Sequence, residues 1–186
     1  MIRIIVPHIL FIILFISYFA NFSAHANWEP AKEGNKIILI RHSIAPGGGD
    51  PPGFKIKDCE TQRNLSQEGI NQSKKIGKLF SKNQIKIHQV LSSQWCRCKD
   101  TAKYAFEKYK EFSALNSTFQ SPYDKNKKKQ LKELKNYIEN WNGDGGNLIL
   151  VTHYVIITAL TDIAPRSGEI IITDKNLNVL STILTR

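Results

Sequence analysis

The sequence predicts an α/β fold, a three-layer sandwich in which helices cover both faces of a largely parallel sheet. Short apolar runs suited to buried strands alternate along the chain with longer segments suited to helices, which is the order expected of such a sheet. Three of the predicted strands also end beside basic or hydroxyl side chains. Ligands of parallel sheets gather at the carboxyl ends of the strands, so a binding site is expected there.

The first 26 residues have the layout of a secretory signal peptide. A short basic start is followed by the apolar run 9–20 and by Ala24-His25-Ala26, an A-x-A cleavage pattern. The run is short for a bilayer, which needs about 20 apolar residues, although an uncleaved anchor is the alternative. We therefore expect residues 27–186 to form one exported domain, periplasmic or secreted, whose mature form does not span a membrane.

The chain of 186 residues is basic, with 26 Lys and Arg against 16 Asp and Glu and a formal net charge of +10. Removal of residues 1–26 takes away Arg3 alone among charged side chains, which leaves +9. Such a balance favours anionic partners, and export argues against nucleic acid as one of them. The alternative is that Lys and Asn are simply common surface residues in this chain.

The first predicted strand is KIILI (36–40), a continuous apolar run of the kind buried on both faces of a sheet. Residues 43–64 are rich in glycine, proline and charge, and they predict a long loop. Ser66 is a favourable helix start, and apolar residues at helical spacing extend this helix to about Phe80.

The middle of the chain predicts a second strand at QVLSS (89–93) and a helix over 98–110. A third strand is expected over 113–119. The leucines and other apolar residues within 127–141 recur at helical spacing, so this segment is predicted to be a helix.

The last part begins with NGDGG (142–146), a predicted turn, and NLILVT (147–152), another buried strand. An apolar helix is expected over 155–162. EIIIT (169–173) and VLSTIL (179–184) flank a polar turn and predict a closing hairpin.

Side chains suited to a phosphoryl group stand at the ends of three strands. Arg41 and His42 follow the first strand, Arg97 lies four residues beyond the second, and His153 follows the strand at 147–152. Guanidinium groups bind phosphate oxygens in pairs, and a neutral imidazole can attack phosphorus. A single histidine at a strand end is more often structural, but this joint occurrence favours a phosphoryl-transfer site.

Four segments resemble the motifs of the histidine phosphatase superfamily, also called phosphoglycerate-mutase-like. They are LIRHSIAP (39–46), NLSQEG (64–69), SSQWCRCKDTA (92–102) and LVTHY (150–154), and they occur in the order of the family. The resemblance spans roughly residues 36–174. It implies the phosphoglycerate-mutase-like fold and a phosphohistidine intermediate, with no metal and no other cofactor.

The resemblance implies a role for each matched residue. His42 is the nucleophile, and Arg41, Arg97 and His153 form the phosphate pocket, with His153 also counted among the catalytic residues. Arg63, just before the second motif, is either a further phosphate contact or a surface arginine.

The sequence departs from the family pattern at several positions. Ser43 replaces a glycine beside the nucleophile, Cys98 replaces an alanine, and Tyr154 stands where one branch of the family has its acidic proton donor. Four carboxylates are candidates for that donor by their place in the loops: Asp50, Asp58, Glu60 and Glu169. A proton from solvent is the alternative.

Three cysteines predict one disulfide in an exported protein, between Cys59 and either Cys96 or Cys98. Residues 47–49, three consecutive glycines, lack the Gly-Lys-Ser/Thr of a nucleotide loop and suggest a flexible flap. Trp95 is expected either to stack on a sugar or to pack against a helix. The Lys-rich segment 124–135 either docks on an anionic surface or is the solvated face of a helix.

The function predicted from these observations is an exported histidine acid phosphatase-type phosphomonoesterase. Its substrate class is a phosphorylated small molecule or glycan, such as a phosphorylated sugar or a lipopolysaccharide component, by analogy with the small exported branch of the family. The alternative is a catalytically idle phosphate-binding envelope protein of the same fold, and a third possibility is an anchored structural protein. The sequence leaves the oligomeric state open.

Overall fold

The computed structural model describes residues 27–186, so the predicted signal peptide at 1–26 lies outside the described residues. The strands are β1 (Ile37–Arg41), β2 (Ile87–Ser92), β3 (Lys110–Glu111), β4 (Asn147–Thr152), β5 (Ile170–Thr173) and β6 (Val179–Ile183). The α-helices are α1 (Glu29–Lys32), α2 (Gln67–Lys82), α3 (Cys96–Phe106), α4 (Lys127–Asn140) and α5 (Tyr154–Thr161). Three short 3-10 turns are η1 (Cys59–Thr61), η2 (Ser113–Leu115) and η3 (Tyr123–Asn126).

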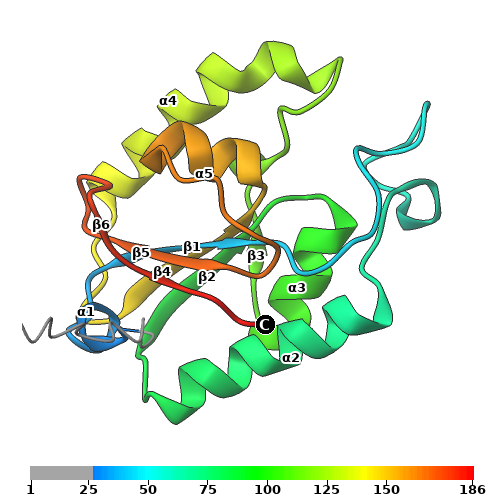
Figure 1. The fold of residues 1–186 in the computed structure, drawn as a ribbon. Coiled ribbons are helices and arrows are strands. Elements are labelled where there is room, and N and C mark those ends of the chain that lie inside the picture. Colours follow the sequence, from blue (N-terminus) through cyan, green and yellow to red (C-terminus); the bar gives the residue numbers. More distant parts are fainter. Residues whose placement is uncertain (1–26) are drawn as a thin grey trace, which may run out of the picture.

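The strands form one sheet in the order β3-β2-β4-β1-β5-β6 (Figure 1). The first four in this order are parallel, and β5 and β6 close the sheet as an antiparallel hairpin. The register pairs Arg41 of β1 with Thr152 of β4, and Ser92 of β2 with Val151. The residues that follow these three strands therefore emerge at the same edge of the sheet.

The prediction of a three-layer sandwich is confirmed. Strands β1 and β4 are almost wholly buried, because each is apolar on both faces. Helices α1, α2 and α3 pack on one face of the sheet, and α4 and α5 pack on the other. Among the residues that the structure describes, no helix is both long and apolar enough to cross a membrane.

Helix α2 begins as predicted, because the Ser66 hydroxyl accepts a hydrogen bond from the Gly69 backbone N–H at 3.2 Å. Gly69 also allows the helix to lie against the loop after β1. A Cβ atom at this position would come within 2.1 Å of the Ile44 carbonyl oxygen. The glycine of the second motif thus brings α2 close to the residues that follow His42.

The strand predicted over 113–119 is wrong. In this part of the chain the residues that pair with β2 are Lys110 and Glu111, which precede the predicted strand. The chain then turns into η2, where Ala114 and Leu115 are buried beneath α4. The apolar residues of this segment fill the space between sheet and helix, and the sequence pattern alone does not distinguish that role from a strand.

The helix predicted over 98–110 is α3, which begins at Cys96 and ends at Phe106. It starts earlier because the Gln62 side chain accepts a hydrogen bond from the Cys96 N–H at 3.0 Å, which satisfies a free donor of the first turn. It ends earlier because Glu107 adopts a positive φ of 65°.

Candidate active site

A cavity of about 110 Å³ lies beyond the carboxyl ends of the parallel strands. The predicted site residues line it together with the glycine loop and an aromatic rim: Arg41, His42, Gly47, Gly48, Gly49, Asp50, Arg63, Arg97, Ser117, Phe119, His153 and Tyr154. A larger open depression of about 370 Å³ lies at the start of β2, but no arginine lines it. The smaller cavity is therefore the candidate site.

His42 is buried and held in one tautomer. Its Nδ1 lies 2.8 Å from the Ser43 carbonyl oxygen, and a carbonyl oxygen can only accept, so Nδ1 carries the proton and Nε2 keeps a lone pair. Burial lowers the pKa of His42 well below its ordinary value, and the nearby charge of Arg97 lowers it further. The ring is thus neutral, with one nitrogen available as a nucleophile.

His153 stands at the start of α5, with its ring centroid 5.5 Å from that of His42. Its Nε2 donates to the Ser93 hydroxyl oxygen at 2.9 Å, since that hydroxyl in turn donates to the Asn116 side-chain oxygen at 3.2 Å. Burial lowers the pKa of His153 well below its ordinary value, and Arg97 and His42 add to the effect. Ser93 and Asn116 therefore orient a second neutral imidazole beside the first.

Two arginines each present a buried donor to this region. The Arg41 Nη1 donates to the Pro165 carbonyl oxygen at 2.8 Å, and the Arg97 Nη1 and Nη2 donate to the Asp50 carboxylate. The Nε atoms of both arginines are buried and have no acceptor among the described residues. Because a buried unpaired donor is costly, a tetrahedral anion in the cavity would stabilise both groups.

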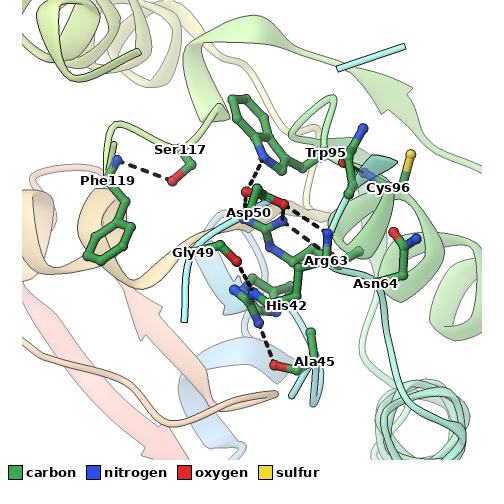
Figure 2. Close-up of polar contacts among 12 residues, drawn as sticks. His42, Ala45, Gly49, Asp50, Arg63, Asn64, Trp95, Cys96, Ser117 and Phe119 are labelled. Atoms are coloured by element: carbon green, nitrogen blue, oxygen red, sulfur yellow. Dashed lines mark hydrogen bonds and ion pairs between the residues drawn. The ribbon is translucent and has the colours of Figure 1, made fainter. Parts of the chain in front are cut away.

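Arg63 lines the cavity but bonds mainly to the backbone of the glycine loop. Its Nε donates to the Gly49 carbonyl oxygen at 2.8 Å, and its Nη1 donates to that of Ala45 (Figure 2). Gly47 and Gly49 have φ values of +92° and +75°, which favour glycine. Arg63 therefore fixes the loop at the cavity wall, a role that the sequence did not indicate.

The four candidate proton donors differ in their position relative to the cavity. Asp50 lines the cavity, whereas Asp58 accepts from the Glu60 N–H and caps η1. Glu60 is exposed, and Glu169 accepts from the Arg166 N–H. Asp50 is thus the one member of this set close to the predicted nucleophile.

The sugar-stacking interpretation of Trp95 is wrong, and the packing alternative is confirmed. The side chain is only 1% exposed and contacts the rings of Phe54, Tyr123 and His153. Its Nε1 donates to the Asp50 carboxylate at 2.9 Å (Figure 2). Trp95 is therefore a buried residue that holds Asp50 and packs against His153.

Sequence reasoning missed the aromatic rim of the cavity. Phe119 is 53% exposed, and its ring centroid lies 6.1 Å from that of Tyr154. An exposed phenylalanine beside Ser117 and Gln120, in a polar stretch, was the available signal. It was hidden because this segment was predicted to be a strand.

Cys59 and Cys96 form a disulfide, one of the two predicted pairings, and Cys98 is a buried free thiol. The disulfide joins η1, four residues before Arg63, to the first residue of α3, next to Arg97. Burial raises the pKa of Cys98 to about 12. The Cys98 sulfur lies 3.4 Å from the Nε2 of His153 and is a neutral packing partner.

The fold and the cavity define an α/β protein with a basic cavity at the carboxyl ends of its parallel strands. No protein-family model matches the sequence, and no curated protein matches it. Solved structures do match the fold. The protein histidine phosphatase SixA complexed with tungstate is 12% identical with a TM-score of 0.56, and the match covers 81% of this chain and 97% of that one.

Two further solved structures are similar over a comparable share of the chain. A protein from Escherichia coli assigned as an alpha-ribazole-5'-P phosphatase is 14% identical with a TM-score of 0.57, covering 80% of this chain and 95% of that one. TTHB049 from Thermus thermophilus is 14% identical with a TM-score of 0.56, covering 80% and 98%. The chain therefore has the phosphoglycerate-mutase-like fold of the histidine phosphatases, as its motifs predict.

Proposed function

We propose that the chain is an exported phosphatase that hydrolyses phosphomonoesters through a phosphohistidine on His42. One observation carries the proposal. A neutral imidazole with an available Nε2 shares a cavity of about 110 Å³ with two guanidinium groups whose buried Nε–H donors have no acceptor among the described residues. This combination fits a tetrahedral dianion that is bound and attacked in the same place.

The reaction follows from the tautomer of His42. Arg41 and Arg97 hold the phosphoryl oxygens while Nε2 attacks phosphorus, forming the P–N bond as the ester P–O bond breaks. The departing oxygen takes a proton from solvent. Because Nδ1 keeps its proton, the phosphorylated ring is cationic, and the Ser43 carbonyl oxygen stabilises it by accepting that N–H. Water then attacks phosphorus, the electron pair returns to Nε2, and phosphate is released.

The proposed substrate is a phosphorylated sugar or a lipopolysaccharide component. The net charge of +10 favours an anionic partner. The names of two similar structures concern a protein histidine phosphatase and an alpha-ribazole-5'-P phosphatase, so this fold acts on phosphoryl groups carried by different leaving groups. Export is supported by the signal-like residues 1–26 and by the disulfide, since disulfides persist mainly in oxidising compartments.

The test is phosphate release from an aryl phosphate and from a panel of sugar phosphates, with wild type, His42→Ala and His88→Ala. His88 is exposed and outside the cavity, so it is the matched control. We expect His42→Ala to lower kcat/KM more than about 1,000-fold, as loss of a nucleophile does, and His88→Ala to match wild type. An acid-labile phosphoryl group should form on wild type and on His88→Ala but not on His42→Ala.

The rival function is an idle anion-binding protein of the same fold. Wild type that binds tungstate but releases no phosphate from any substrate would support the rival. Equal rates for wild type and His42→Ala would remove the nucleophile from the proposal. Cleavage and export are tested independently of the activity assays: the chain is expressed with residues 1–26, and the N-terminus of the recovered protein is sequenced.

A further inference from the structure

The Asp50 carboxylate accepts hydrogen bonds from four donors. Oδ1 accepts from the Arg97 Nη1 at 2.7 Å and from the Arg63 backbone N–H at 3.1 Å. Oδ2 accepts from the Arg97 Nη2 at 3.1 Å and from the Trp95 Nε1 at 2.9 Å. The side chains of Asp50 and Arg97 are each only 3% exposed. Asp50 and Arg97 thus form a buried ion pair beside the cavity, and both oxygens of the carboxylate are hydrogen-bonded.

The position of Asp50 does not depend on Arg97 alone. The backbone N–H of Asp50 donates to the Gln120 side-chain oxygen at 2.9 Å, and Arg63 holds the loop through Gly49. A Cβ atom at Gly49 would lie 2.9 Å from the same oxygen of Gln120, so glycine lets the loop approach this anchor. The loop therefore holds the carboxylate in place independently of its bonds to the Arg97 guanidinium.

The donors of Arg97 show which edge of its guanidinium is in use. A guanidinium carries five N–H bonds in one plane. Nη1 uses both of its hydrogens, on the Asp50 Oδ1 and on the Arg63 carbonyl oxygen at 3.3 Å, and Nη2 uses one on the Asp50 Oδ2. The Nε–H and the second Nη2–H remain, and they form the adjacent edge of the plane. Nε is buried without an acceptor among the described residues.

We propose that Asp50 is a positioning residue. It binds the Nη1–Nη2 edge of the Arg97 guanidinium, the outer edge, and so keeps the adjacent Nε–Nη2 edge facing the phosphoryl group. This rests on the proposed function, since it assigns the second edge to the phosphoryl oxygens. A planar fork held by a fixed carboxylate at one edge needs no reorganisation when an anion binds the other. Trp95 takes part by bonding the same carboxylate.

Two other roles for Asp50 make different predictions. As proton donor it would need a hydrogen on an oxygen, yet both oxygens already accept from N–H groups. As a competitor of the substrate it would occupy the donors that the phosphoryl group uses, yet it bonds the outer edge and leaves the adjacent one. The geometry favours positioning over both.

The experiment measures kcat and KM for Asp50→Asn and Asp50→Ala on aryl phosphates of graded leaving-group acidity. We expect kcat to fall about 10- to 100-fold, by the same factor across the series, because a misplaced guanidinium weakens every transition state alike. KM should change less than about 3-fold, because poorer orientation and reduced repulsion of the anion oppose each other. Asp58→Asn removes a carboxylate charge outside the cavity and keeps an oxygen that can cap η1, so it is the matched carboxylate control and should match wild type.

Other outcomes would overturn the assignment. A fall in kcat that grows as the leaving group becomes more basic would identify a proton donor. An unchanged or higher kcat with tighter tungstate binding would identify a competitor. Melting temperatures show which variants fold. If neither Asp50 variant folds, Trp95→Phe removes one bond to the carboxylate and should lower kcat several-fold, again independently of the leaving group; a wild-type kcat for Trp95→Phe would then refute the positioning role.

A second measurement separates this inference from the proposed function. The Nε–H resonance of Arg97, identified by its loss in Arg97→Lys, should shift when tungstate is added to wild type even if no substrate is hydrolysed. Tungstate that binds without shifting this resonance would refute the assignment of the Nε edge. An absence of turnover together with the expected shift would refute only the phosphatase activity.

Discussion

The two cavity histidines should make the folded protein less stable as the pH falls below neutral. Burial lowers the pKa of both His42 and His153 well below the ordinary value, whereas in the unfolded chain each titrates near 6.5. Below about pH 6.5 the unfolded state therefore binds more protons than the folded state, and the free energy of unfolding falls as the pH falls. This holds until the pH reaches the lowered values.

The size of the effect follows from two neutral buried rings. Between about pH 7.5 and 5.5 each histidine that stays neutral when folded costs about 1.4 kcal/mol of stability, so the pair costs about 2.7 kcal/mol. The free energy of unfolding can be measured by urea denaturation at the two pH values, in a buffer free of phosphate. We expect this loss to appear when wild type is compared with variants that lack one of the two histidines. His42→Asn and His153→Asn should each remove about half of it.

His88→Asn is the control for replacing a histidine elsewhere in the fold, because His88 is exposed and lies outside the cavity. Other titrating groups are common to all the variants and cancel in the differences. If His42→Asn keeps the full pH dependence of wild type, the folded ring is protonated at pH 5.5, and it is then not the neutral nucleophile described above.

Two further predictions concern the cysteines. The double variant Cys59→Ser/Cys96→Ser opens a disulfide with a sequence separation of 37, and the chain-entropy relation gives a loss of about 3.8 kcal/mol; the melting temperature should fall on the order of 10 °C, as it should in wild type treated with reductant, and an unchanged melting temperature would contradict this. Cys98, buried and with its pKa raised to about 12, should react with iodoacetamide only after unfolding in urea, and rapid labelling of the folded protein would show that the thiol is accessible.

The sequence predicted that four residues of the cavity lie together, because their positions depend on the sheet. Arg41, His42 and His153 follow directly from apolar strands, and parallel strands bring their carboxyl ends to one edge whatever the loops do. Arg97 belongs to the same class, since it lies in the first turn of the helix after β2. These positions could be predicted from periodicity and strand order.

The supporting half could not be predicted, because it depends on contacts between loops. Asp50 meets Arg97 across 47 positions of sequence, and nothing in the local pattern distinguishes it from Asp58. Trp95 could have stacked on a ligand, and only the position of the glycine loop shows that it bonds Asp50 instead. Phe119 was missed because the segment 113–119 was predicted to be a strand, whereas its apolar residues Ala114 and Leu115 fill the space beneath α4 and Phe119 is exposed at the cavity.

The disulfide has a consequence for where this polypeptide can mature. It links the segment that carries Arg63 to the helix turn that carries Arg97, so a single oxidation step secures two of the three cavity guanidiniums against each other. A chain made and kept among reduced thiols would have to assemble the same geometry through weak bonds alone. Thiol oxidation would then be a maturation step for the cavity as well as a source of stability.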